Sequence, residues 1–322
     1  MSFPSETVSI GMPASDADSR VVLVVNNFDR ISGPAFFDTP SYAGFENGLD
    51  SGVPYIEDIA YIGRMHQNRR ILPWTDDDNP GFGASDQDYA GRKVAGNTFD
   101  YAYMHGKSVM KAGHPFISCS NEAFCEGFGS DAWTVDLICG KQVTTLVGSG
   151  MQEKYTVWSP AIQKTLTEFA SRGGNILVSG SYIGTDITGG IFPVQKDSIF
   201  MENSIKFAKE VLGYRPMCGQ ASRRAMLKAV RNPYVDLGGM GVFGFHNEVN
   251  PDCYSVEYPD GIVPATASGS TVLRYNDSGI SAGVAHEGTG YRTVCLGFPV
   301  ETLREETDID SIIHITLDFF KK

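Results

Sequence analysis

The distribution of apolar residues divides the chain into short apolar runs and stretches of helical periodicity. A run of about four to eight apolar residues predicts a buried β-strand, whereas apolar residues recurring every three or four positions predict a helix with one buried face. The predicted strands are residues 21–26, 115–120, 134–139, 175–179, 270–275, 281–286 and 292–298. The predicted helices are residues 97–112, 159–172, 202–213 and 308–320.

The clearest of these signals is the helix at 159–172. Ser159 is a favourable N-cap, because its hydroxyl can accept a hydrogen bond from an amide of the first helical turn. Ile162, Leu166 and Phe169 recur at helical spacing and mark the buried face. Gly173 then ends the helix, since glycine adopts the left-handed conformation without a Cβ clash. The apolar run that follows predicts a strand buried on both faces of a parallel sheet.

Helices that alternate with apolar strands predict a three-layer α/β sandwich, with a mostly parallel sheet between two layers of helices. Residues 270–286 differ, because a glycine turn joins two strands into an antiparallel hairpin, which we expect at one edge of the sheet. Residues 31–96 hold few periodic runs but many Gly, Pro and Asp residues, which predicts a long ordered insertion. We therefore expect a polar segment at 1–20, a linker or chain end, followed by a single α/β domain at 21–322.

Charge and hydropathy exclude two classes of partner. The net charge of −12 and the absence of a run rich in Lys or Arg argue against binding to nucleic acid or to an anionic membrane. No apolar segment approaches the roughly 20 residues that span a bilayer. Residues 1–20 carry no secretory signal, and their polar character leads us to expect a piece of a longer protein with flanking domains.

The six cysteines do not form a C-x-x-C pair. Cys119, Cys139 and Cys295 lie within apolar strand-like runs, where a buried free thiol is the usual arrangement. The other three lie in looser stretches, where a structural disulfide stays open as the less favoured alternative.

A glycine-flanked turn follows the strand at 175–179. Gly180 and Gly184 have the spacing of a nucleophile elbow, in which the central residue of G-x-S-x-G attacks the substrate. The central residue here is Tyr182, where such an elbow has Ser or Cys. The pattern therefore predicts the scaffold of an enzyme without the expected nucleophile.

Residues 22–34, 113–122 and 290–301 together resemble segments of a family of bacterial proteins labelled as xanthan lyases. The resemblance covers about residues 20–320 of this chain. It implies a class I glutamine amidotransferase-like (flavodoxin-like) sandwich that is associated with golvesin-like and fibronectin-like modules. It also implies a secreted, periplasmic or cell-surface location, with a polysaccharide or oligosaccharide as the partner.

Ligands of open α/β sheets bind outside the carboxyl ends of the strands, where this chain carries many polar side chains. Carboxylates and amides there can bind sugar hydroxyls, and a tyrosine can stack on a sugar ring. The same residue types also cap helices and turns wherever strands end, so a purely structural role stays open. The candidate ligand-binding residues are Asn26, Asp29, Arg30, Ser120, Asn121, Ser181 and Glu301, and the candidate catalytic residues are Glu122, Tyr182 and Asp186.

Three kinds of catalysis place different demands on these residues. Glutamine hydrolysis needs a thiolate at the elbow, which Tyr182 removes, although His246 and Glu248 have the required His-x-Glu spacing. Cys139 lies in apolar surroundings that favour an inert thiol. A lyase needs a cation and a base, and a hydrolase needs two carboxylates at a suitable separation. For a lyase the available pairs are Arg30 with Tyr182 and His105 with Tyr101. For a hydrolase the available pairs are Asp29 with Glu122 and Asp29 with Asp186.

No metal or cofactor site is expected. The run Asp76-Asp-Asp-Asn79 lacks the spacing of an EF-hand and favours a solvated loop. The glycine-rich residues 238–244 follow no predicted strand and begin no predicted helix, which argues against a phosphate-binding loop.

The sequence thus predicts an exported, non-catalytic, carbohydrate-associated module of a polysaccharide-degrading protein. The alternatives are a polysaccharide lyase or hydrolase that uses the strand-end cluster, and a structural spacer or oligomerisation domain.

Overall fold

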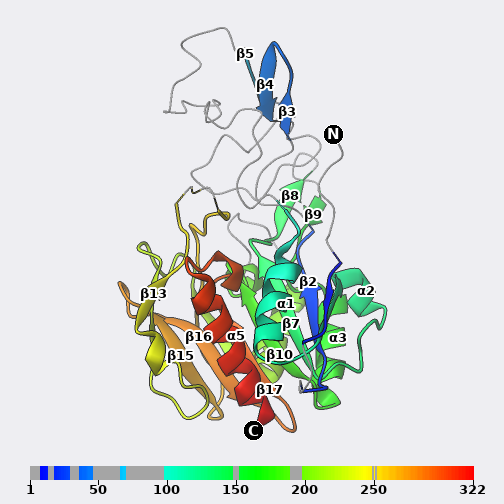
Figure 1. Ribbon diagram of the computed structural model, residues 1–322, viewed down its shortest axis with the longest axis vertical. Helices are drawn as coiled ribbons and strands as arrows, with labels where there is room; N and C mark the ends of the chain where they lie inside the picture. The colour runs from blue at the N-terminus through cyan, green and yellow to red at the C-terminus, as the bar shows by residue number, and fades with distance from the viewer. Residues whose placement is uncertain are drawn as a thin grey trace. The chain divides into compact units, whose positions relative to one another are not determined.

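The chain divides into two compact units, and each is described separately. The computed structural model describes residues 8–13, 18–29, 36–45, 66–69, 98–147, 152–188, 198–248, 250 and 252–322 (Figure 1). One unit comprises Met1–Ser5, Asp29–Phe99 and Val249–Tyr254, and the other, called here the α/β unit, comprises Glu6–Phe28, Asp100–Glu248 and Ser255–Lys322. The first unit contains a three-stranded antiparallel sheet of β3 (Phe36–Asp38), β4 (Tyr42–Phe45) and β5 (His66–Arg69). Most of the predicted insertion at 31–96 lies outside the described residues.

A ten-stranded sheet forms the centre of the α/β unit, and five adjacent strands in it are parallel. In spatial order these are β6 (Phe116–Ser120), β2 (Val22–Asn26), β7 (Thr134–Gly140), β10 (Asn175–Gly180) and β17 (Arg292–Leu296). Numbered along the chain, this is the order 2-1-3-4-5 of flavodoxin-like folds. The predicted flavodoxin-like arrangement of parallel strands is confirmed for the centre of the sheet.

Antiparallel strands extend the sheet at both ends. β1 (Ile10–Gly11) pairs with β6, and the other end continues through β16 (Ser281–Glu287), β15 (Gly269–Tyr275), β12 (Met226–Ala229) and β13 (Val242–Gly244). The predicted hairpin is thus present as β15 and β16. Its predicted position at the edge is wrong, because β12 pairs with β15 and β13 pairs with β12. Two small antiparallel pairs lie outside this sheet: β8 (Thr145–Val147) with β9 (Gln152–Lys154), and β11 (Tyr214–Cys218) with β14 (Gly261–Pro264).

Helices cover both faces of the sheet and complete the predicted three layers. On one face α1 (Tyr101–Lys111) and α5 (Glu306–Lys321) lie side by side (Figure 1). The other face carries α2 (Asn121–Cys125), α3 (Pro160–Ser171) and α4 (Ser198–Phe207), which continues into the π-helix η5 (Ala208–Leu212). α4 begins four residues before the predicted start at 202, and α1 begins four residues after the predicted start at 97.

Local sequence explains the ends and the buried face of α3. The Ser159 hydroxyl accepts a hydrogen bond from the Ile162 amide at 3.3 Å, as an N-cap does. Ile162, Leu166 and Phe169 are buried, as predicted. Gly173 follows the helix with a φ of +89°, the left-handed conformation that favours glycine.

Strand alternation decides which side chains meet which helices. In β7, Val135, Leu137 and Cys139 belong to the apolar cluster that packs against α3. Because side chains alternate across a strand, Asp136 points to the opposite face, which α1 and α5 cover. A carboxylate thus lies in the middle of a buried strand.

Candidate functional site

The glycine-flanked turn after β10 does not present its central residue to solvent. Residues 181–184 form a turn that leads into the short 3-10 helix η4 (Thr185–Thr188). Tyr182 is only 1% exposed, and its ring stacks on Tyr258 with centroids 5.7 Å apart. The Ser181 hydroxyl donates to the Tyr258 carbonyl at 2.8 Å. Both candidates on this turn are therefore packed against the same segment of chain.

Asp186 is buried in the same region and binds backbone amides. Its Oδ1 accepts from the Thr144 amide at 2.7 Å, and its Oδ2 accepts from the Val157 amide at 2.9 Å. This carboxylate holds the loops before β8 and after β9 to the end of β10. Such bonding is typical of a structural carboxylate.

The topological switch point of the sheet lies between β2 and β7, where a flavodoxin-like fold binds its ligand. Asn26 and Asn27 lie at the end of β2 and are each 2% exposed. The Asn27 side chain donates to the Val157 carbonyl at 3.2 Å and contacts the Cys139 sulfur at 3.5 Å. Burial raises the pKa of Cys139 to about 12, so this thiol stays protonated, as its apolar surroundings predicted.

At the end of β6 the polar residues begin a helix that the sequence did not reveal. The Ser120 hydroxyl caps α2 by accepting from the Ala123 amide at 3.4 Å. Asn121 and Glu122 form the first turn of this five-residue helix. Glu122 is exposed, in contrast to Tyr182 and Asp186.

Glu301 belongs to a buried ionic cluster that joins three elements. It lies in the 3-10 helix η7 (Val300–Thr302) after β17. Its Oε2 is 3.4 Å from Nε2 of His105 on α1, and Nδ1 of His105 is 2.7 Å from Oδ2 of Asp136 on β7. His105 and Glu301 are at most 1% exposed, as is Asp136.

The carboxylates decide the protonation of His105. Burial alone would lower the pKa of this histidine, but Asp136 and Glu301 outweigh the burial and raise it to about 10. At neutral pH the ring is therefore an imidazolium between two carboxylates, and both ring nitrogens are engaged. His105 is thus a bonded core residue and is not exposed as the catalytic base considered from the sequence.

The remaining predicted residues are spread over the chain. Asp29 is exposed and belongs to the other unit, and Arg30 lies outside the described residues, as do residues 76–79. The His246 amide donates to the Thr302 carbonyl at 2.9 Å, which places this histidine beside η7. The carboxyl ends of β2, β6, β7, β10 and β17 thus gather several candidates at one edge of the sheet, but most of them are buried and bonded within the protein.

A segment without any sequence signal runs across this edge. Residues 255–260, called here the strap, contact the ends of three parallel strands. The Glu257 carboxylate pairs with Lys141 Nζ, which follows β7, at 2.7 Å. The Tyr258 carbonyl accepts from Ser181, and the Asp260 amide donates to the Gly297 carbonyl after β17 at 2.7 Å.

Other candidate sites are few in the part of the chain that the structure describes. None of its groups of His, Cys, Asp or Glu could hold a metal ion, and none of its helices is long and apolar enough to cross a membrane. None of the six cysteines forms a disulfide in the part of the chain that the structure describes. The burial predicted for Cys119, Cys139 and Cys295 is confirmed.

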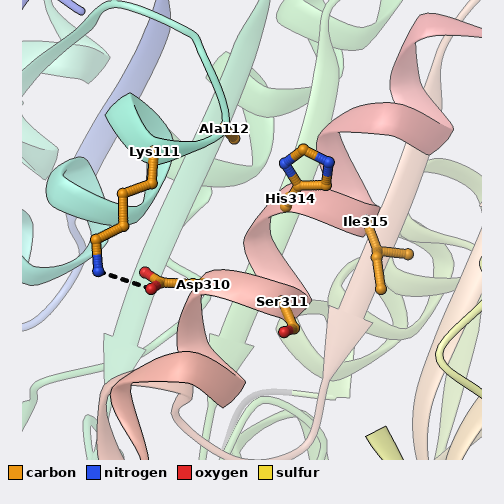
Figure 2. A pocket seen from close by; sticks show the side chains of 6 residues that line it. All are labelled: Lys111, Ala112, Asp310, Ser311, His314 and Ile315. Atoms are coloured by element: carbon orange, nitrogen blue, oxygen red, sulfur yellow. Dashed lines mark hydrogen bonds and ion pairs between the residues drawn. The ribbon is translucent and has the colours of Figure 1, made fainter. Parts of the chain in front are cut away.

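A surface groove of about 270 Å³ lies between α1 and α5 (Figure 2). Its charged groups are already paired, because Lys111 binds Asp310 at 2.7 Å and His314 lies 3.2 Å from Asp318. The groove therefore offers little uncompensated charge to a ligand. Its lining residues are Lys111, Ala112, Asp310, Ser311, His314 and Ile315.

A scan against protein-family models and a search of curated proteins gave no match. Among solved structures, a cytoplasmic protein from Salmonella typhimurium LT2 is 8% identical, over 91% of this chain and 98% of its own, with a TM-score of 0.48. A GMP synthase-like protein from Thermoplasma acidophilum is 10% identical, over 71% of this chain and 94% of its own, with a TM-score of 0.38.

A β-galactosidase from Bacillus circulans sp. alkalophilus is 10% identical over 68% of this chain, with a TM-score of 0.41. The chain spans only 26% of the length of that enzyme. At such identities and TM-scores these similarities carry no argument about what this chain does. Its flavodoxin-like architecture follows from the strand order described above.

Proposed function

We propose that the α/β unit is a non-catalytic module that binds carbohydrate within an exported, polysaccharide-degrading protein. The observation that carries the non-catalytic part is the burial of Tyr182, which takes the place of the elbow nucleophile and is 1% exposed beneath Tyr258. The proposal is also supported by the bonding of Asp186 to backbone amides and of Glu301 to His105. The resemblance of residues 22–34, 113–122 and 290–301 to xanthan lyase-like proteins supports the carbohydrate part.

The test combines binding and turnover in one experiment. The protein is titrated with xanthan fragments and with neutral oligosaccharides by calorimetry, and the same mixtures are assayed by ultraviolet absorbance for a lyase product and by reducing-sugar formation for hydrolysis. We expect binding without turnover in either assay. Failure to bind any saccharide would remove the proposal and leave the structural-spacer alternative.

Turnover would favour the enzymatic alternative, and one matched pair of variants then locates it. Glu122 and Glu126 are both exposed and lie within or directly after the short helix α2. Activity that Glu122→Gln abolishes and Glu126→Gln retains would place the chemistry at the strand ends and refute a non-catalytic role.

A further inference from the structure

The strap is a fixed part of the α/β unit. The Val256 amide donates to the His246 carbonyl at 2.8 Å. The Asp260 carboxylate accepts from the Gly184 and Thr185 amides at 2.6 Å each, and the Tyr275 hydroxyl donates to the Asp260 carbonyl at 2.8 Å. Because these bonds hold both ends of the strap, the side chains between them are ordered before any ligand arrives. Such pre-organisation lowers the entropic cost of binding.

Tyr258 is the aromatic residue that the strap presents. Its ring is tilted by only 23° from that of Tyr182, so the buried ring forms a support for the partly exposed one. A side chain at Gly219 would collide with it, because an added Cβ would lie 2.2 Å from the Tyr258 ring. The hydroxyl of Tyr258 has no hydrogen-bond partner among the described residues. The absence of a side chain at Gly219 thus accommodates the Tyr258 ring, and the hydroxyl at the end of this ring makes no hydrogen bond to the described residues.

Glu257 precedes Tyr258 in the strap and supplies a hydrogen-bond acceptor on the same segment. One carboxylate oxygen accepts from the Ser255 hydroxyl at 2.7 Å and the other accepts from Lys141 at 2.7 Å. A carboxylate has about four acceptor positions, so the partly exposed Glu257 retains capacity for a ligand hydroxyl. A partly exposed aromatic ring and a carboxylate on one ordered segment suit a sugar ring, which has apolar C–H faces and hydroxyls at its rim.

We propose that the strap is the carbohydrate-binding surface of this module, with Tyr258 stacked on a pyranose ring and Glu257 accepting a hydrogen bond from a sugar hydroxyl. This inference rests on the proposed function. It assigns the stacking on the sugar to Tyr258 in place of the buried Tyr182. The favoured ligand is uncharged, because the net charge of −12 disfavours a polyanion.

The test is calorimetric titration of the full chain with cellohexaose as the neutral probe and a xanthan fragment as the acidic one. We expect Tyr258→Leu to weaken cellohexaose binding by about five- to ten-fold, the loss of one aromatic contact, while Tyr258→Phe changes it less than two-fold. Tyr103→Leu is the matched control, because Tyr103 is a 55% exposed tyrosine on α1. The acidic probe is expected to bind more weakly at low salt than the neutral one.

A fluorescent variant keeps the inference testable if Tyr258→Leu does not fold. Tyr258→Trp retains an aromatic ring, and its emission, measured against that of the wild type, is expected to shift when cellohexaose is added. Unchanged emission at saturating ligand, or wild-type affinity in Tyr258→Leu, overturns the inference while the proposed function stands. Failure of the wild type to bind either probe overturns both.

Discussion

Replacement of His105 tests whether the buried ionic cluster contributes to stability as its geometry indicates. His105→Gln removes the positive charge and leaves the carboxylates of Asp136 and Glu301 buried without a counter-ion. Breaking a buried ion pair by removing one partner typically costs about 3–5 kcal/mol. We expect a loss of this order in the free energy of unfolding at pH 7, measured by urea denaturation with fluorescence detection.

The pH dependence gives a second and more specific signature. The pKa of His105 is raised from the ordinary 6.5 to about 10 in the folded protein. A raised histidine pKa stabilises the folded state fully below pH 6.5, and the stabilisation is lost as the pH rises through about 10. At about 1.4 kcal/mol for each pH unit, the full effect is about 5 kcal/mol, of which about 4 kcal/mol remains at pH 7. Wild-type stability should therefore fall steeply between pH 7 and pH 10, and His105→Gln should lack this fall.

His314→Gln is the control for the same substitution at an exposed site. His314 pairs with Asp318 on α5, and its side chain is 53% exposed. Titration of lysines and tyrosines near pH 10 affects all three proteins alike and cancels in the comparison. Equal stability losses in the two variants, or parallel pH profiles for wild type and His105→Gln, would refute the assignment of a charged His105.

Three further predictions follow from burial and packing. Burial raises the pKa of Asp260 to about 7, so its contribution to stability is greatest at low pH and is lost as the pH rises from about 4 to about 7. The thermal midpoint of the wild type should therefore fall over this pH range. In Asp260→Asn the thermal midpoint should depend less on pH over the same range. Gly106→Ala should lower the thermal midpoint, because the added methyl would lie 2.1 Å from the Phe116 ring and overpacking costs about 1–3 kcal/mol, more than the gain of about 1 kcal/mol in helix propensity. A disulfide-exchange reagent should modify the exposed Cys218 in the folded protein and reach Cys139 only after unfolding, which mass spectrometry can follow.

The elements predicted correctly share one property, namely that a local pattern determines them. Helix α3 carries its cap, its apolar face and its terminating glycine within 15 consecutive residues, and the parallel strands are buried on both faces and therefore read as continuous apolar runs. Strands β12 and β13 were missed because they are short and have partly exposed residues. Helix α2 was missed because five residues are too few to show a helical period.

The chemistry of the strand ends could be predicted only in part. The sequence correctly predicted that Glu301 and Asp186 lie at the carboxyl ends of the parallel strands. It could not show that both side chains are bonded within the protein. One signal was available for the ionic cluster: Asp136 interrupts an apolar strand, and a buried carboxylate requires a partner. That the partner is His105, 31 residues earlier on another element, depends on tertiary packing.

The strap was beyond the reach of sequence reasoning because its meaning depends on long-range contacts. Tyr258 and Tyr182 are 76 positions apart, yet they form a single stacked pair at the edge where flavodoxin-like folds bind ligands. The central residue of the turn after β10 is therefore a support for another side chain and is not itself available to a substrate. The residue that stands where an elbow has its nucleophile is thus the one whose ring supports Tyr258.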